Sequence, residues 1–87
     1  MKRIVKFEMQ PGTNVSQRVH YLKPVYMAFQ QGTLCAWFEE YAHLPVDKPQ
    51  EFYVAVTGEQ VDSNWQFVAT AMTQDQDFVC HLFEVRP

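Results

Sequence analysis

The sequence lacks the segments that would tie it to a membrane or to secretion. No uninterrupted apolar run approaches the roughly 20 residues that a membrane-spanning helix needs. No basic segment followed by an apolar one marks a secretory signal peptide. We therefore expect a soluble protein in a reducing compartment that makes no contact with a membrane.

Charge of one sign is also scarce. The formal net charge is −3, the longest acidic run is Glu39-Glu40, and the only basic cluster is Lys2, Arg3 and Lys6. A nucleic-acid-binding domain normally carries a basic stripe, and a protein that imitates duplex DNA is normally far more acidic. The charge balance favours neither of these classes and indicates solubility.

Motifs for catalysis or metal binding are absent as well. The candidate groups are Cys35, Cys80, His20, His43 and His81, and no two of them have the short fixed spacing of a zinc site. Cys80 and His81 are adjacent, so on a strand they point to opposite faces. Cys35 meets His81 only if their strands are neighbours and both side chains share a face. Since no nucleophile elbow, P-loop or H-E-x-x-H occurs, we predict buried unpaired thiols, no metal, no cofactor and no enzymatic activity.

What the chain does have is large apolar side chains. Its 87 residues allow one domain, spanning 1–87, and 47% of them are apolar, including seven Phe, four Tyr and two Trp. A chain this short buries only about 60–65% of its extended surface, so we expect self-association to cover part of the rest. We predict a homodimer joined through an edge strand or through exposed rings such as Tyr26 and Trp37.

Apolar and polar residues alternate along most of the chain with the period of a β-strand. Turn residues interrupt this alternation at 11–14, 30–32 and 74–77, and Pro24 removes a ladder donor, which predicts a break or a sheet edge. The predicted fold is all-β and mainly antiparallel, a small sandwich or barrel of six or seven strands. Strands are expected over 3–9, 15–22, 25–29, 33–38, 51–57, 65–72 and 78–85.

The segment 40–50 is predicted to be the longest irregular stretch, because its two prolines disfavour helix before them. It has room for one short helical turn at 41–44. Long loops often carry function, but Tyr41, Leu44 and Val46 are also apolar enough to plug an open barrel end. Both interpretations stay open.

Two interpretations also fit the tyrosines and tryptophans. Exposed rings beside basic side chains stack on nucleotides or single-stranded nucleic acid, whereas a small domain needs large side chains in its core. We expect the core to take most of them, and the one or two left on the surface to mark a protein–protein patch. The rings concerned are Tyr21, Tyr26, Trp37, Tyr53 and Trp65.

An ordered set of short motifs resembles a family of small proteins encoded by tailed bacteriophages. The motifs are Lys6-Phe7-Glu8 followed by Gly12, Q-x-G-x-L-C-x-W at 30–37, Thr57-Gly58, and V-x-H-x-F-E at 79–84. The sequence departs from the family at Cys80, where tryptophan is usual, and at Glu59, where histidine is usual. The resemblance covers nearly the whole chain and implies a phage origin and action inside an infected bacterium. The family has no assigned function, so no site residue carries over from it.

These observations together predict a non-catalytic module that binds a host or phage protein in the cytoplasm of the infected bacterium, as inhibitors and take-over factors do. The predicted contact residues are Tyr26, Trp37, Tyr41, His43 and Leu44. One alternative is a β domain that sequesters a nucleotide or binds single-stranded nucleic acid, with Arg18 or Lys23 on phosphate. A second alternative is a homo-oligomeric component of the virion or of its assembly apparatus.

Overall fold

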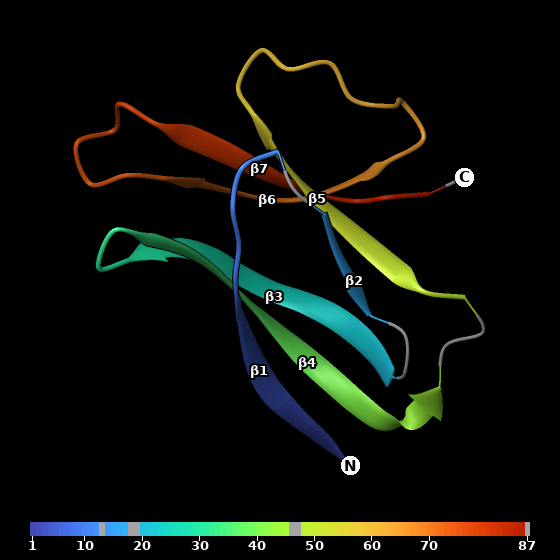
Figure 1. Ribbon diagram of the computed structural model, residues 1–87. Coiled ribbons are helices and arrows are strands. Elements are labelled where there is room, and N and C mark those ends of the chain that lie inside the picture. The colour runs from blue at the N-terminus through green and yellow to red at the C-terminus, as the bar shows by residue number, and fades with distance from the viewer. Residues whose placement is uncertain (13, 18–19, 46–47, 87) are drawn as a thin grey trace.

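The chain folds into two antiparallel β-sheets, as the computed structural model in Figure 1 shows. It describes residues 1–12, 14–17, 20–45 and 48–86, and within these residues there are seven strands and no helix that could cross a membrane. The fold is therefore all-β, as predicted from the period-two alternation. The strands are β1 (Lys2–Glu8), β2 (Asn14–Gln17), β3 (His20–Gln30), β4 (Thr33–Pro45), β5 (Gln50–Val56), β6 (Gln66–Met72) and β7 (Val79–Glu84).

The two sheets are built from different parts of the chain. The three-stranded sheet has the order β1-β4-β3, and the four-stranded sheet has the order β2-β5-β7-β6. The hairpin between β3 and β4 turns on Gln31 and Gly32, which have φ angles of 52° and 82°. Two positive φ angles in a two-residue loop match the twist of the flanking strands, and the turn lies where the sequence predicted it.

Apolar side chains from the inner faces of both sheets meet in one core. Phe38 of β4 and Phe52 of β5 are both 0% exposed, and their ring centroids lie 5.0 Å apart. This ring pair joins the two sheets, so the architecture is that of a small β-sandwich. The other buried members of the core are Met9, Leu22, Met27, Leu34, Ala36, Val54, Ala71, Cys80 and Leu82.

The single strand predicted over 15–22 was wrong. β2 ends at Gln17 in the four-stranded sheet and β3 begins at His20 in the other sheet, so the chain changes sheets there. Pro24 does lie on an edge strand, as predicted, but it does not break β3. The register instead shifts between Pro24 and Tyr26, and a bulge on an edge strand tolerates the missing donor.

The irregular stretch predicted over 40–50 was also wrong in its first half. β4 continues to Pro45, because Tyr41 pairs with Lys2 of β1 on one side and with Tyr21 of β3 on the other. The ladder on both sides supplies hydrogen bonds that local propensity does not reveal. Residues 41–44 form no helical turn, and Leu44 is 44% exposed and plugs nothing; Val46 lies outside the described residues.

Candidate functional site

The face of the three-stranded sheet that points away from the core carries a row of aromatic rings. Phe38 points into the core, so its neighbour Trp37 points outward, and Trp37 pairs with Lys6 of β1 and Tyr26 of β3. We call this side of the sheet the outer face. The register assigns to it Lys2, Ile4, Lys6, Glu8, Tyr21, Lys23, Tyr26, Ala28, Gln30, Thr33, Cys35, Trp37, Glu39, Tyr41 and His43.

The rings on the outer face are paired with one another, two of the pairs across strands and one along β4. The Tyr26 and Trp37 centroids lie 5.8 Å apart, and Tyr41 lies 5.9 Å from both Tyr21 and His43. Tyr26 is 62% exposed and Tyr21 39% exposed. Tilted pairs at these distances are favourable contacts that hold the rings in place. The outer face therefore presents ordered aromatic surface to solvent.

An ion pair lies among these rings. Lys2 Nζ is 3.0 Å from Glu39 Oε2, the Tyr41 hydroxyl donates to Glu39 Oε1 at 2.7 Å, and Lys2 Nζ lies 5.6 Å from the Tyr41 ring centroid. Hydrogen bonds from Tyr41 and then Lys2 lower the pKa of Glu39. Hydrogen bonding to Glu39 in turn raises the pKa of Lys2 and the pKa of Tyr41. The network keeps all three groups in their neutral-pH forms.

A pH dependence follows from this network. Because the pKa of Glu39 is lower in the folded than in the unfolded chain, its contribution to stability is present above the unfolded pKa and is lost as pH falls through the folded pKa. We expect Glu39→Gln to be slightly less stable than the parent chain at neutral pH, with the difference closing in acid. Denaturant unfolding of both chains from neutral pH to mildly acidic pH measures this; a difference that grows in acid contradicts it.

A second polar contact crosses the sheet and covers a thiol. Lys6 Nζ donates to Gln30 Oε1 at 3.0 Å, from β1 to β3. In the register, the line joining these two positions passes over Cys35 of the central strand, which pairs with Glu8 and Ala28. Cys35 is only 2% exposed although it lies on the outer face, and a polar contact above its position accords with that burial.

The structure brings four of the five predicted contact residues together. Tyr26, Trp37, Tyr41 and His43 all lie on the outer face, whereas Leu44 is next to His43 in β4 and points to the opposite side of the sheet. Of the two residues predicted to contact phosphate, Lys23 lies on the outer face and Arg18 lies outside the described residues.

Sequence reasoning missed part of this site. Lys2, Ile4 and Glu39 were not among the predicted contacts, although the alternation along β1 placed Ile4 and Lys6 on one side. We also expected the core to take most of five rings, and this was wrong, because none of the five belongs to the buried core. The rings occupy the positions that alternate with the buried ones.

The side of the four-stranded sheet that points away from the core carries two further ring pairs and a hydrogen-bonded histidine. Tyr53 lies 5.3 Å from Trp65, and Phe67 lies 5.9 Å from Phe83. His81 is held at both ring nitrogens, with Thr57 Oγ1 2.8 Å from Nε2 and Thr70 Oγ1 3.0 Å from Nδ1. This histidine therefore has one hydrogen-bond partner directly after β5 and another within β6.

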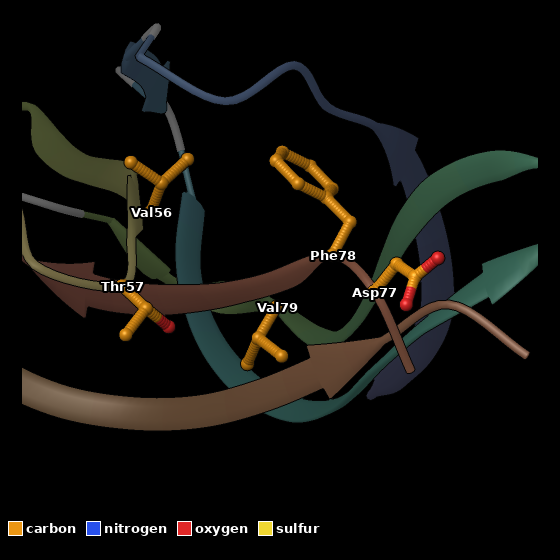
Figure 2. A pocket seen from close by; sticks show the side chains of 5 residues that line it. All are labelled: Val56, Thr57, Asp77, Phe78 and Val79. Carbon is orange, nitrogen blue, oxygen red and sulfur yellow. The ribbon is translucent and has the colours of Figure 1, made fainter. Parts of the chain in front are cut away.

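Figure 2 shows a hollow between the end of β5 and the start of β7. Its volume is about 460 Å³. Val56 and Phe78 point to one side of the strands and Thr57 and Val79 to the other, while Asp77 supplies the one charged group of the lining. Ligand sites need polar groups that converge on one point, and these side chains diverge, so the hollow has the shape of a surface depression rather than a built site.

The two cysteines are free and buried, as predicted. Cys35 lies on the outer face of one sheet and His81 on the outward side of the other, so they cannot form a nucleophile pair. Cys80 lies in the core, where burial raises the pKa of its thiol. Within the described residues no three His, Cys, Asp or Glu side chains gather in a way that could hold a metal ion.

We expect neither thiol to react with a thiol reagent in the folded protein. The thiolate is the reactive form, and reagent access requires Cys35 or Cys80, both at most 2% exposed, to leave its packing. Titration with an excess of an aromatic disulfide reagent should give two equivalents per chain in denaturant and nearly none without it. Fast release of one equivalent from the native protein contradicts the arrangement described for that cysteine.

Comparison with known proteins gives one match over the whole chain. The model of a family described as a domain of unknown function (DUF7352) matches residues 1–87. No curated protein and no solved structure matches the chain.

Proposed function

Because the chain belongs to DUF7352, a family of domains of unknown function, we propose its role from its own surface: it is a non-catalytic module that binds one partner protein on the outer face of its three-stranded sheet. The observation that carries this proposal is the cross-strand pairing of Tyr26 with Trp37 and of Tyr21 with Tyr41 on that face. Tyr and Trp are enriched at protein interfaces and among their hot spots. Rings already fixed by neighbours lose little entropy on binding.

The charges on the outer face suggest the chemistry of the partner. Three lysines lie on the face against two glutamates, in a chain whose formal net charge is −3. Lys23 is exposed at the margin beside the rings. A partner that presents apolar or aromatic side chains flanked by carboxylates would complement this surface, since opposite charges at a rim speed and orient association.

The biological setting belongs to the same proposal. The motifs at 30–37, Thr57-Gly58 and 79–84 resemble those of small tailed-phage proteins. This resemblance supports a phage-encoded protein that acts on a host or phage protein in the cytoplasm of an infected bacterium. The proposed action is occlusion of the partner's surface, because a small module without catalytic groups acts by occupying a site.

The proposal is tested by comparing two variants that each lose one exposed ring. Tagged parent chain, Tyr26→Ala and Phe67→Ala are used to capture proteins from a bacterial lysate. Tyr26 lies on the outer face and Phe67, 51% exposed, lies on the other sheet. We expect one protein, identified by mass spectrometry and then purified, to bind the parent and Phe67→Ala but not Tyr26→Ala. Equal capture by all three contradicts the assignment of the face.

Binding of a nucleotide or of single-stranded nucleic acid is the second candidate. It is favoured by the presence of Lys2, Lys6 and Lys23 on the same face as the rings, which is the arrangement of stacking platforms. Against it, Glu39 lies among those rings and is bound to Lys2. The protein partner therefore fits the face better.

Salt dependence separates the two candidates. If the face binds single strands, three lysines neutralise at most three phosphates, so log affinity should fall with log salt with a slope of about 2 or less. Fluorescence anisotropy with a labelled single-stranded oligonucleotide at several salt concentrations measures this slope. Affinity in the nanomolar range at physiological salt, lost in Tyr26→Ala, would favour nucleic acid over the protein partner.

A further inference from the structure

The outer edge of β1 exposes backbone groups that could pair with another strand. β1 lies at one margin of the three-stranded sheet, and within the described residues β4 is its only hydrogen-bonded strand (Figure 1). We propose that the chain forms a two-fold dimer in which β1 pairs antiparallel with β1 of a second copy, centred on Val5. This goes beyond the proposed partner binding and does not depend on it.

In β1, the backbone N–H and C=O groups of every second residue point away from β4 and are free for such pairing. The Met9 N–H donates to the Leu34 carbonyl at 2.9 Å, in the same register that pairs Glu8 with Cys35. The N–H and C=O groups of successive residues point to opposite sides of a strand. The backbone groups of Arg3, Val5 and Phe7 therefore point toward β4, as those of Met9 do. The groups that point away from the sheet belong to Lys2, Ile4, Lys6 and Glu8.

Among the edges of the two sheets, β1 is the one whose pairing is limited neither by a proline, nor by a register shift, nor by short length. Edge strands usually avoid pairing through these devices or through charged side chains, and the charges of β1 are of both signs, so they can match across a two-fold pair. β3 contains Pro24 and a register shift, β6 contains a register shift between Phe67 and Ala69, and β2 has four residues. β1 runs for seven residues in unbroken register with β4, and Ile4 is 58% exposed.

The charges along β1 favour the two-fold pair centred on Val5 over the pairs centred on its two neighbours. Centred on Val5, Lys2 lies opposite Glu8 of the second copy at both ends, and Ile4 lies opposite the stem of Lys6. The free backbone groups of the even-numbered residues then face one another, as an antiparallel ladder requires. A pair centred on Ile4 would place Lys2 opposite Lys6, and one centred on Lys6 would oppose two lysines. Opposite charges across a ladder stabilise it and like charges destabilise it.

The dimer would place the outer faces of the two copies side by side. The two-fold axis passes midway between the two Val5 residues, perpendicular to the sheet, so two three-stranded sheets join into one continuous sheet. Both outer faces then point to the same side, and each contact occurs twice, as in any isologous interface. The dimer thus presents two aromatic faces next to each other, which suits a partner that is itself two-fold symmetric or repetitive.

A charge-exchange experiment tests both the strand and the register. Sedimentation velocity on the parent chain at tens of micromolar is expected to show a species of twice the 10.2 kDa chain mass. Lys2→Glu and Glu8→Lys each convert both attractive end pairs to repulsive ones, so each alone should weaken dimerisation by about tenfold or more. Mixed one to one, the two variants restore attraction at both ends and should form a heterodimer of nearly parental affinity.

Two controls keep the outcome unambiguous. Lys23→Glu makes the same charge change on β3 and should leave the dimer intact, and circular dichroism checks that every variant is folded. Ile4→Pro removes one outward-pointing N–H and should give a folded monomer. A parent chain that stays monomeric at high micromolar concentration, or folded variants that do not recover on mixing, overturns the proposal. Neither outcome bears on partner capture by the outer face, which a monomer can also perform.

Discussion

Replacing Phe38 by alanine is expected to destabilise the fold by about 3–5 kcal/mol, the range for truncating a buried phenylalanine. Phe38 is 0% exposed, and its ring lies 5.5 Å from Phe7 of its own sheet and 5.0 Å from Phe52 of the other sheet. The substitution therefore removes a ring contact between the two sheets at the centre of the core. Because small domains have only about 5–15 kcal/mol of stability in total, we expect Phe38→Ala to be largely unfolded at 37 °C.

Urea unfolding followed by far-ultraviolet circular dichroism measures this loss. Phe67→Ala is the matched control, because it removes the same ring from a side chain that is 51% exposed and has one ring neighbour, Phe83. Its cost should be about 1 kcal/mol, the value of an aromatic pair at the surface. If the two substitutions cost the same, the core is not centred on the Phe38–Phe52 pair.

Tyr26→Ala is expected to weaken binding to the purified partner by about 30-fold or more, which is the 2 kcal/mol of an interface hot spot. The ring is 62% exposed and contacts Trp37 without entering the core. The variant should therefore keep the parental stability to within about 1 kcal/mol. Isothermal titration calorimetry gives the affinity, and Phe67→Ala again serves as the control, with parental affinity expected.

The sequence predicts which residues of a strand share a face, but it does not predict which of the two faces packs against the other sheet. In β1 the sequence placed Val5 and Phe7 on one face and Ile4 and Lys6 on the other, as the structure does. Over 34–38 of β4 both alternating sets are apolar, so the local pattern does not reveal that Phe38 is buried and Trp37 faces outward. Which face is buried depends on how the two sheets pack together, and residues far away in the sequence determine that packing.

Strand ends were harder to predict than strand centres. Residues 41–45 belong to β4 because Tyr41 pairs with both β1, some forty positions away, and β3, and because Pro45 pairs with His20 of β3. Similarly, the division of 15–22 between two sheets reflects where each half finds a partner. Single-sequence reasoning weighs turn residues and prolines, and long-range pairing overrides these signals here.

The sequence predicts only part of the candidate site, because some of its residues meet through long-range strand pairing. Tyr26, Trp37, Tyr41 and His43 are aromatic residues in or after the predicted hairpin, and the register places them on one face. Lys2 and Glu39 could be added only once β1 was known to lie beside β4. The sequence distance between them, 37 positions, hides their ion pair at 3.0 Å.

Chemical-shift mapping of the isotope-labelled chain, titrated with the purified captured partner, locates the binding surface residue by residue. We expect the amides with the largest shifts to lie in β3, β4 and β1, centred on Tyr26 and Trp37, and the amides of Tyr53, Trp65 and Phe67 on the other sheet to keep their shifts. Shifts centred on those three residues instead, with β3 and β4 unchanged, would contradict the assignment of the outer face as the binding surface.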